Sequence, residues 1–250
     1  MTFDETQSSA RPVETAFHEN EPHQGRIGGK LNWLRAGVLG ANDGIVSTAG
    51  VVIGVAGAAQ GNVLAIATAG VAALVAGAFS MAGGEYVSVS TQRDTEQALI
   101  EKEKRELAEE PELELQELAG LYRQRGLSEE VALRVAEELT AHDALAAHAE
   151  VELGIDPEEL TSPWSAALSS FVAFTVGALL PLIMILLPLG EHRVWAAAVA
   201  VVVGLVAAGW ISAALGNARR GRAIMRNVVM GSATMLATYG IGLAFGVAVS

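Results

Sequence analysis

The sequence predicts an all-α membrane protein, with five transmembrane helices and a cytoplasmic helical insert between the second and the third. Of the 250 residues, 51% are hydrophobic and only 18% are charged, which is too apolar for an ordinary water-soluble domain. The charges are also segregated, because 20 of the 28 acidic residues fall between positions 91 and 163. We therefore expect a polytopic membrane protein with one acidic, water-exposed insert.

Five stretches are long enough to cross the bilayer, whose hydrocarbon of about 30 Å needs about 20 apolar residues. The one charged residue within them is Asp43. They cover residues 36–59, 63–82, 164–189, 194–218 and 227–249. The chain thus divides into four parts. Residues 1–30 form a disordered leader, which lacks the apolar core of a secretory signal. Residues 31–90 contain two spans, residues 91–162 form the acidic insert, and residues 163–250 contain the other three spans.

Lysine and arginine in the connections predict the orientation, because these residues are retained on the cytoplasmic side. The leader and its junction carry four of them, and the connection between the fourth and fifth spans carries four more. The two connections at the other end carry only Arg193. We expect a cytoplasmic N-terminus and insert, whether the membrane is the inner membrane of a bacterium or that of an organelle.

Small residues predict how the spans pack. The first span contains the pair Gly50 and Gly54, and the fifth contains Gly242 and Gly246. Glycines four residues apart let two membrane helices approach closely. This pattern indicates a compact bundle and carries no functional information.

The insert is predicted to contain three amphipathic helices. Pro111 separates the first two, because proline suits a first helical turn and not a helix interior. Gly126 is expected to end the second helix, Ser128 to cap the third, and Gly154 to end it. The first helix continues the second span to about residue 109. The second covers residues 111–124 and the third covers residues 129–153.

A row of five glutamates runs through the insert at spacings of three and four residues, which places them along one helical line. Like charges at these spacings repel by a few tenths of a kcal/mol per pair, so we expect a compensating cation. The third helix adds two acid–histidine pairs at i and i+4, Glu138 with His142 and Glu152 with His148. Carboxylates with an imidazole suit Fe(II), Mn(II) or Zn(II). The predicted metal ligands are Glu103, Glu106, Glu110, Glu114, Glu117, His148 and Glu152.

The acidic row has a plainer interpretation, since Glu-rich helices are usually solvated faces. A di-iron oxidase of the ferritin type would need Glu-x-x-His on two helices. Leu139 and Leu145 stand three residues before the two histidines of the third helix, so this pattern is missing. The sequence therefore favours a binding or transport site over a redox enzyme, and we expect no enzymatic activity.

Composition excludes several other classes of site and partner. The absence of cysteine excludes disulfides, thiolate zinc sites, iron–sulfur clusters and cysteine nucleophiles. The net charge of −12 makes nucleic acid an unexpected partner and cations an expected one. No permanently bound cofactor is predicted.

Three side chains within the spans are candidates for a transport path. Asp43 lies about two turns into the first span, where a carboxylate costs about 2.5–3.5 kcal/mol on insertion scales, so a functional role is the first hypothesis. Met81 and Glu85 share one face at the end of the second span. A soft thioether beside a hard carboxylate could suit Fe(II). The plain alternatives are a cap near the interface for Asp43 and core packing for Met81.

Five motifs stand out along the chain: GVLGANDGIVST at 37–48, SMAGGEYVS at 80–88, QRD at 92–94, AHDAL at 141–145 and ELG at 152–154. Together they resemble the vacuolar iron transporter family, which includes yeast and bacterial iron and manganese exporters. The resemblance extends from about position 31 to the C-terminus. It is most specific in the first two motifs.

The resemblance implies a homodimer with five spans per subunit and a cytoplasmic metal-binding domain. Family members move Fe(II), and often Mn(II), out of the cytoplasm in exchange for protons. Asp43 and Met81 match positions in the path between subunits, and His148 stands where plant members have methionine. The matching glutamates of the metal-binding domain are Glu103, Glu106, Glu114, Glu117 and Glu152.

The sequence therefore suggests a proton-coupled exporter of Fe(II), with Mn(II) as an open alternative, whose partners are metal ions, protons, the lipid bilayer and a second copy of the chain. Two other classes stay open. The first is a membrane-anchored metal sensor or buffer that transports nothing. The second is a scaffold whose acidic helices recruit a basic protein.

Overall fold

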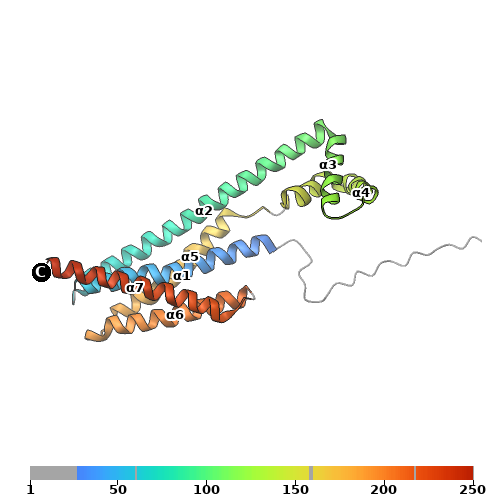
Figure 1. Ribbon diagram of the computed structural model, residues 1–250. Coiled ribbons are helices and arrows are strands. Elements are labelled where there is room, and N and C mark those ends of the chain that lie inside the picture. The colour runs from blue at the N-terminus through green and yellow to red at the C-terminus, as the bar shows by residue number, and fades with distance from the viewer. Residues whose placement is uncertain (1–26, 60, 158–159, 217, 250) are drawn as a thin grey trace, which may run out of the picture.

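The computed structural model describes residues 27–59, 61–157, 160–216 and 218–249, and all regular structure in these ranges is helical. Five of the helices are long and apolar enough to cross a membrane. These are α1 (Ile27–Ala58), α2 (Val63–Glu109), α5 (Pro163–Leu186), α6 (Arg193–Leu215) and α7 (Arg220–Val249). The predicted all-α fold with five spans and a helical insert is confirmed (Figure 1).

The insert comprises the last part of α2, from about residue 91, together with α3 (Pro111–Gln124), α4 (Glu129–His148) and the π-helical turn η1 (Ala149–Leu153). Pro111 occupies the first turn of α3, and Gly126 and Gly154 have φ angles of 103° and 65° at the ends of their helices, as their positions predicted. Ser128 stands at the N-cap of α4, but its side chain makes no capping hydrogen bond. The predicted helix ends are therefore confirmed, and the predicted hydroxyl cap is not.

The third insert helix differs from the prediction, which was one continuous helix over 129–153. Asp143 has φ −157° and ψ 96°, so the helix is interrupted there. The last turn, at Ala149–Leu153, is a π-helix. Periodicity misses such a break because the apolar pattern continues on both sides of it.

Helix α1 forms the centre of the bundle and packs against α5, α7, α2 and α6. Close approach depends on glycine at two places. A Cβ on Gly44 would overlap the carbonyl oxygen of Phe174 on α5, and one on Gly242 would overlap the carbonyl oxygen of Gly54. Of the predicted Gly-x-x-x-Gly pairs, Gly54 and Gly242 therefore meet directly, while Gly50 lies against Thr238 and Gly246 against Ala58.

The bundle core is aliphatic and lies around α1. Its fully buried side chains include Val52, Ile185 and Leu205, contributed by α1, α5 and α6. This core fixes the relative positions of the spans, and therefore the end of the bundle from which the insert projects.

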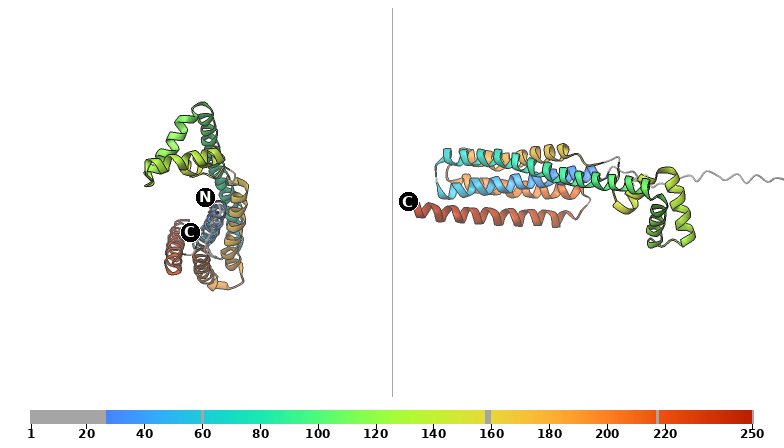
Figure 2. Two further views of the ribbon diagram at one scale, coloured as in Figure 1. Left: turned by 90° about the vertical axis from the view of Figure 1, so that its right-hand side faces the viewer. Right: turned by 90° about the horizontal axis from the view of Figure 1, so that it is seen from above.

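The insert, the start of α1 and the α6–α7 connection lie at one end of the bundle, and the C-terminal end of α7 lies at the other (Figures 1 and 2). Helix α2 has 47 residues and is therefore about 70 Å long, more than twice what the bilayer requires. It carries the chain out of the bundle into the insert without interruption. Of the predicted leader, residues 1–26 lie outside the described ranges, and α1 begins at Ile27.

Candidate metal centre

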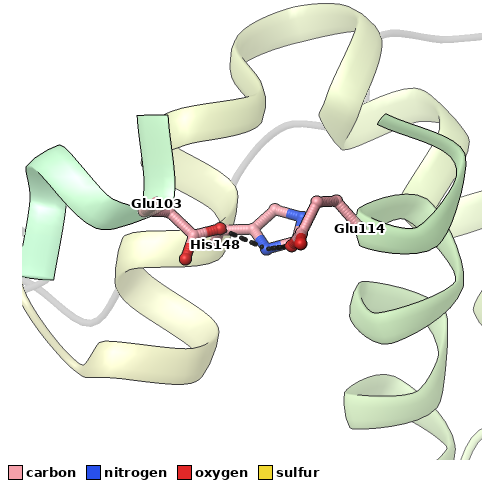
Figure 3. Close-up of side chains that lie close together, drawn as sticks. All are labelled: Glu103, Glu114 and His148. Atoms are coloured by element: carbon pink, nitrogen blue, oxygen red, sulfur yellow. Dashed lines mark ion pairs between the residues drawn. The ribbon is translucent and has the colours of Figure 1, made fainter. Parts of the chain in front are cut away.

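Three ligand side chains meet inside the insert. Glu103 comes from α2, Glu114 from α3 and His148 from the end of α4, and all three are buried. One ligand atom from each lies within 4.8 Å of the others. His148 lies between the two carboxylates, which approach it from opposite sides (Figure 3). Three different helical segments therefore contribute to one small polar cluster.

The corner between α2 and α3 places the two glutamates. Helix α2 ends at Glu109, and Pro111 starts α3 in a new direction, because its ring has the φ angle of a first helical turn and needs no N–H donor there. Beneath the cluster, α3 and α4 pack through Leu118 and Ala136. This apolar contact holds the ends of the three segments together.

The break at Asp143 places the histidine. The Oδ1 atom of Asp143 accepts a hydrogen bond from the N–H of Ala146 at 2.9 Å, as an N-cap would. A new helical segment therefore starts here and carries His148 to a fully buried position. The π-helical turn follows, held to the end of α3 by a hydrogen bond from Arg125 Nη2 to the Val151 carbonyl at 3.0 Å. Turns of this kind occur frequently at functional sites.

The distances show how closely the ligand atoms converge. His148 Nδ1 lies 2.9 Å from Glu103 Oε1, 3.6 Å from Glu114 Oε2 and 3.7 Å from Glu152 Oε2. Despite the short distance to Glu103, neither ring nitrogen of His148 has a hydrogen bond of acceptable direction within the described structure, and neither does Glu103 Oε1. Buried polar atoms are normally hydrogen-bonded. Ligand atoms that lie this close together without hydrogen bonds to one another could hold a cation.

The electrostatics of the cluster support the same interpretation. Burial raises the pKa of Glu103, and the neighbouring Glu152 carboxylate raises it further, while His148 acts in the opposite direction. Burial likewise raises the pKa of Glu114, with a further contribution from Glu117. Without a cation, this site is an unfavourable place for ionised carboxylates. A divalent ion would remove that cost.

The other predicted ligands of the insert lie at different distances from this cluster. The side chain of Glu152 is 28% exposed but reaches His148, so it can complete a four-ligand set. Glu106 is half-buried and is paired with Lys102 at 2.6 Å. Glu117 is exposed, and Glu110 is exposed at the α2–α3 corner. The structure thus assembles three of the seven predicted ligands fully and one in part.

The second acid–histidine pair of α4 is not part of the cluster. Glu138 and His142 are both exposed and precede the break at Asp143. An i, i+4 spacing alone therefore did not distinguish the buried pair from the exposed one.

The membrane candidates are arranged differently. Asp43 is half-buried on α1, while Met81 packs against Phe174 and the small residues around it. Glu85 is buried, and its Oε2 lies 3.6 Å from Arg35 Nη2. The one group of three acidic or histidine ligands found among the described residues is that of the insert, so Asp43 and Glu85 belong to no such group.

The chain is similar to known proteins over most of its length. Residues 34–243 match the model of the VIT family, a range that includes all five spans and the insert. The chain belongs to the VIT family. It is 41% identical over 225 residues to a protein of Acanthamoeba castellanii named vacuolar iron transporter, covering 90% of this chain and 82% of that one.

Two plant relatives of this VIT-family chain are similar over nearly the same range. Vacuolar iron transporter homolog 1 of Oryza sativa subsp. japonica is 40% identical over 222 residues, covering 87% of this chain and 75% of the relative. Vacuolar iron transporter homolog 2 of Arabidopsis thaliana is 35% identical over 213 residues, covering 85% and 84%. The family resemblance drawn from the motifs is confirmed. The VIT family is one of transporters, so the expectation that the chain is not an enzyme is confirmed too.

Sequence reasoning missed two residues of this VIT-family chain, Asp143 beside the metal centre and Arg35 in the bundle. Asp143 acts by interrupting α4, and the available signal was an N-cap residue type in mid-helix. Arg35 was counted only as a charge for orientation, although it faces Glu85. Its signal was weaker, because no spacing rule connects residues on two separate helices.

Proposed function

We propose that this protein transports Fe(II) across the membrane from the side that carries the insert. The observation that carries the proposal is the buried group of Glu103, Glu114 and His148, in a chain whose relatives are named vacuolar iron transporters. Two carboxylates and an imidazole are ligands of intermediate hardness. They suit Fe(II), with Mn(II) as a second substrate and Zn(II) as a further ion that the insert could hold.

In this proposal the insert collects the ion and the bundle conducts it. Glu152 and Glu106 would add oxygen ligands at the partly exposed side of the cluster, where an ion enters from water. The path through the bundle would use Glu85, Met81 and Asp43, on α2 and α1. A second copy of the chain would complete this path, since the described residues of one chain bring no three acidic or histidine ligands together there.

Proton exchange and direction belong to the same proposal. A carboxyl group within the membrane can take up a proton when it releases a cation, so Asp43 would couple metal release to proton entry from the far side. The excess of Lys and Arg at the insert end supports a cytoplasmic insert, and hence export from the cytoplasm. The membrane would be the inner membrane of a bacterium, or the vacuolar membrane in a eukaryote.

Reconstitution into vesicles tests this function. Purified protein is placed in proteoliposomes that enclose a pH-sensitive dye, and Fe(II) under reducing conditions, Mn(II) or Mg(II) is added outside. We expect metal uptake with a coincident proton flux for Fe(II) and Mn(II), and none for Mg(II). Metal uptake without a proton flux would overturn the coupling, and absence of both would overturn transport.

One observation favours a second candidate, a membrane-anchored sensor or buffer. The insert cluster is complete within one chain and needs no residue of the bundle. A buffer would bind metal with the same ligands and transport none. Calorimetric titration of the protein used for the vesicles separates the two functions, because a buffer shows saturable binding with no flux.

A further inference from the structure

A second site is suggested by a cavity at the end of the bundle opposite to the insert. It has a volume of about 930 Å³ and lies between α6 and α7, with α1 behind it. Its floor includes the buried side chains of Ile53 and Met235. The cavity shares no residue with the metal centre or with the predicted path, so it requires another explanation.

The depth of the cavity corresponds to one leaflet of the membrane. Its wall on α6 runs from Arg193 at the start of the helix to Val203, ten residues further on. Ten residues of α-helix extend about 15 Å, which is half of the approximately 30 Å hydrocarbon core. Trp195, 74% exposed beside the mouth, has the interfacial position common for tryptophan in membrane proteins. The cavity is therefore apolar over the length that acyl chains of one leaflet occupy.

The mouth of the cavity carries one acidic and one basic side chain. Glu191 and Arg193 both line it, and they form no ion pair with each other in the described structure. The Arg193 Nε donates a hydrogen bond to the Gly190 carbonyl at 3.1 Å, which holds the guanidinium at the mouth. Within the described residues the terminal guanidinium nitrogens have no partner, so they can bind an anion such as phosphate. Glu191 is exposed beside it and can accept from an ammonium group.

We propose that this cavity binds one diacyl phospholipid whose headgroup carries both a phosphate and a primary ammonium, as phosphatidylethanolamine does. The acyl chains fill the space between α6 and α7, the phosphate contacts Arg193, and the ammonium donates to Glu191. A trimethylated headgroup lacks the N–H donors for Glu191, and an anionic glycerol headgroup lacks the positive charge. This inference does not depend on the proposed transport.

The charges at the mouth favour a lipid over a helix of a second copy. Glu191 and Arg193 stand at the opening of a cavity whose floor is apolar. A headgroup with a phosphate and an ammonium supplies a partner for each charge, whereas the predicted spans of a second copy contain no charged residue other than Asp43.

Lipid retention tests the proposal on the full-length protein. The protein is reconstituted into nanodiscs with equal amounts of phosphatidylethanolamine, phosphatidylcholine and phosphatidylglycerol of identical acyl chains. It is then extracted into mild detergent, and retained lipids are counted by native mass spectrometry. We expect one retained phospholipid per chain, with phosphatidylethanolamine enriched roughly threefold or more over phosphatidylcholine, the size expected for one charged hydrogen bond at a partly exposed site.

Four variants make the test specific. Glu191→Gln should bring the ratio of phosphatidylethanolamine to phosphatidylcholine close to one, and Arg193→Gln should lower retention of all three lipids. Val199→Trp fills the cavity wall and should abolish retention. Val176→Trp is its matched control, because Val176 on α5 is 65% exposed, against 62% for Val199, and does not line the cavity. It should retain lipid like the wild type.

Three results would overturn the proposal. The first is wild-type protein that retains no more lipid than Val199→Trp. The second is a headgroup preference that Glu191→Gln leaves unchanged. The third is evidence that a second copy covers the cavity. In that case the wild type would retain no lipid, and Val199→Trp would convert dimer to monomer whereas Val176→Trp would not.

Discussion

The insert and the bundle both contain buried carboxylates, but they hold them in opposite ways. In the insert, Glu103 and Glu114 point at one imidazole from opposite sides, with ligand atoms within 4.8 Å. In the bundle, Asp43 and Glu85 lie on different helices, belong to no such group, and Glu85 faces the guanidinium of Arg35. The ligand group of the insert could hold a metal ion. In the bundle, the guanidinium of Arg35 already provides the positive charge beside Glu85.

This difference indicates a division of roles. A group of ligands that one chain completes by itself can bind an ion before any change of conformation. Ligands that are separated, or neutralised by an internal charge, need a second chain or a movement before they can bind. In the proposed function, the insert therefore binds the ion first, and the ligands of the bundle assemble only while the ion passes.

The largest expected effect separates conduction from binding. Asp43→Asn should lower metal-driven proton flux roughly 100-fold or more, about 2.7 kcal/mol or more, while the insert binds metal as before. Flux is measured in proteoliposomes and binding by calorimetry on the same preparation. Glu129→Gln, at an exposed acid in the first turn of α4, is the control and should leave both unchanged. Flux that survives Asp43→Asn would remove Asp43 from the path.

The next effect compares two glutamates of one row. Glu103→Gln should weaken Mn(II) binding about 100-fold, because it removes a charged ligand that is buried at the centre of the cluster. Glu110→Gln should change affinity by less than about threefold, since Glu110 is exposed at the α2–α3 corner. Titration calorimetry of the full-length protein in detergent measures both. Equal losses would mean that the whole row binds metal, as the sequence alone suggested.

A third prediction concerns stability without metal. Glu114→Gln removes a carboxylate that is buried among like charges, so the metal-free variant should unfold at a higher temperature than the wild type. The expected increase is about 2–4 °C, the size that corresponds to roughly 1 kcal/mol in a protein of this length. With excess Mn(II) the order should reverse, because only the wild type gains the full binding energy. Differential scanning fluorimetry with and without a chelator measures both.

The pH dependence follows from the raised pKa of Glu103 and Glu114. An acid whose folded pKa is raised binds protons more readily in the folded state, so folding becomes more favourable as pH falls toward the ordinary value of 4.5. In metal-free protein, the unfolding transition of the insert should therefore occur at a higher temperature near pH 5 than near pH 7. Metal affinity should fall over the same range, because protons compete for the carboxylates. Opposite slopes for stability and affinity are the signature to seek.

The smallest effect tests the ion pair of the bundle. Arg35→Gln should lower the half-saturating metal concentration for transport by about twofold to fivefold, because Glu85 becomes free to bind the ion. The effect is modest because the Arg35 side chain is 57% exposed, and such pairs contribute about 1 kcal/mol or less. Arg134→Gln breaks an exposed pair with Glu130 in α4 and should have no effect. An unchanged half-saturation in both variants would mean that the Arg35 pair does not restrain Glu85.

Much of the fold could be predicted from local chemistry. Long uncharged stretches fixed the number of spans, Pro111 fixed the corner of the insert, and Gly126 and Gly154 fixed helix ends through their left-handed backbone. These features depend on a residue and its immediate neighbours, or on transfer from water to lipid. The candidate ligands could be named in the same way, from charge and spacing.

The choice among those candidates could not be made locally. Glu103 and Glu110 are alike in type, row and spacing, yet one is buried beside His148 and the other is exposed. The same holds for the two histidines of α4. His148 is buried and His142 is exposed, and the helix is interrupted between them at Asp143.

The sequence by itself determined the number of spans and the set of possible metal ligands, because hydrophobicity and helical spacing act over one or two turns. Only the tertiary structure decided which carboxylates meet an imidazole, which one meets an arginine, and where α6 and α7 leave a cavity. Burial and mutual distance depend on how separate helices pack, and packing is settled by contacts between residues that are far apart in the chain.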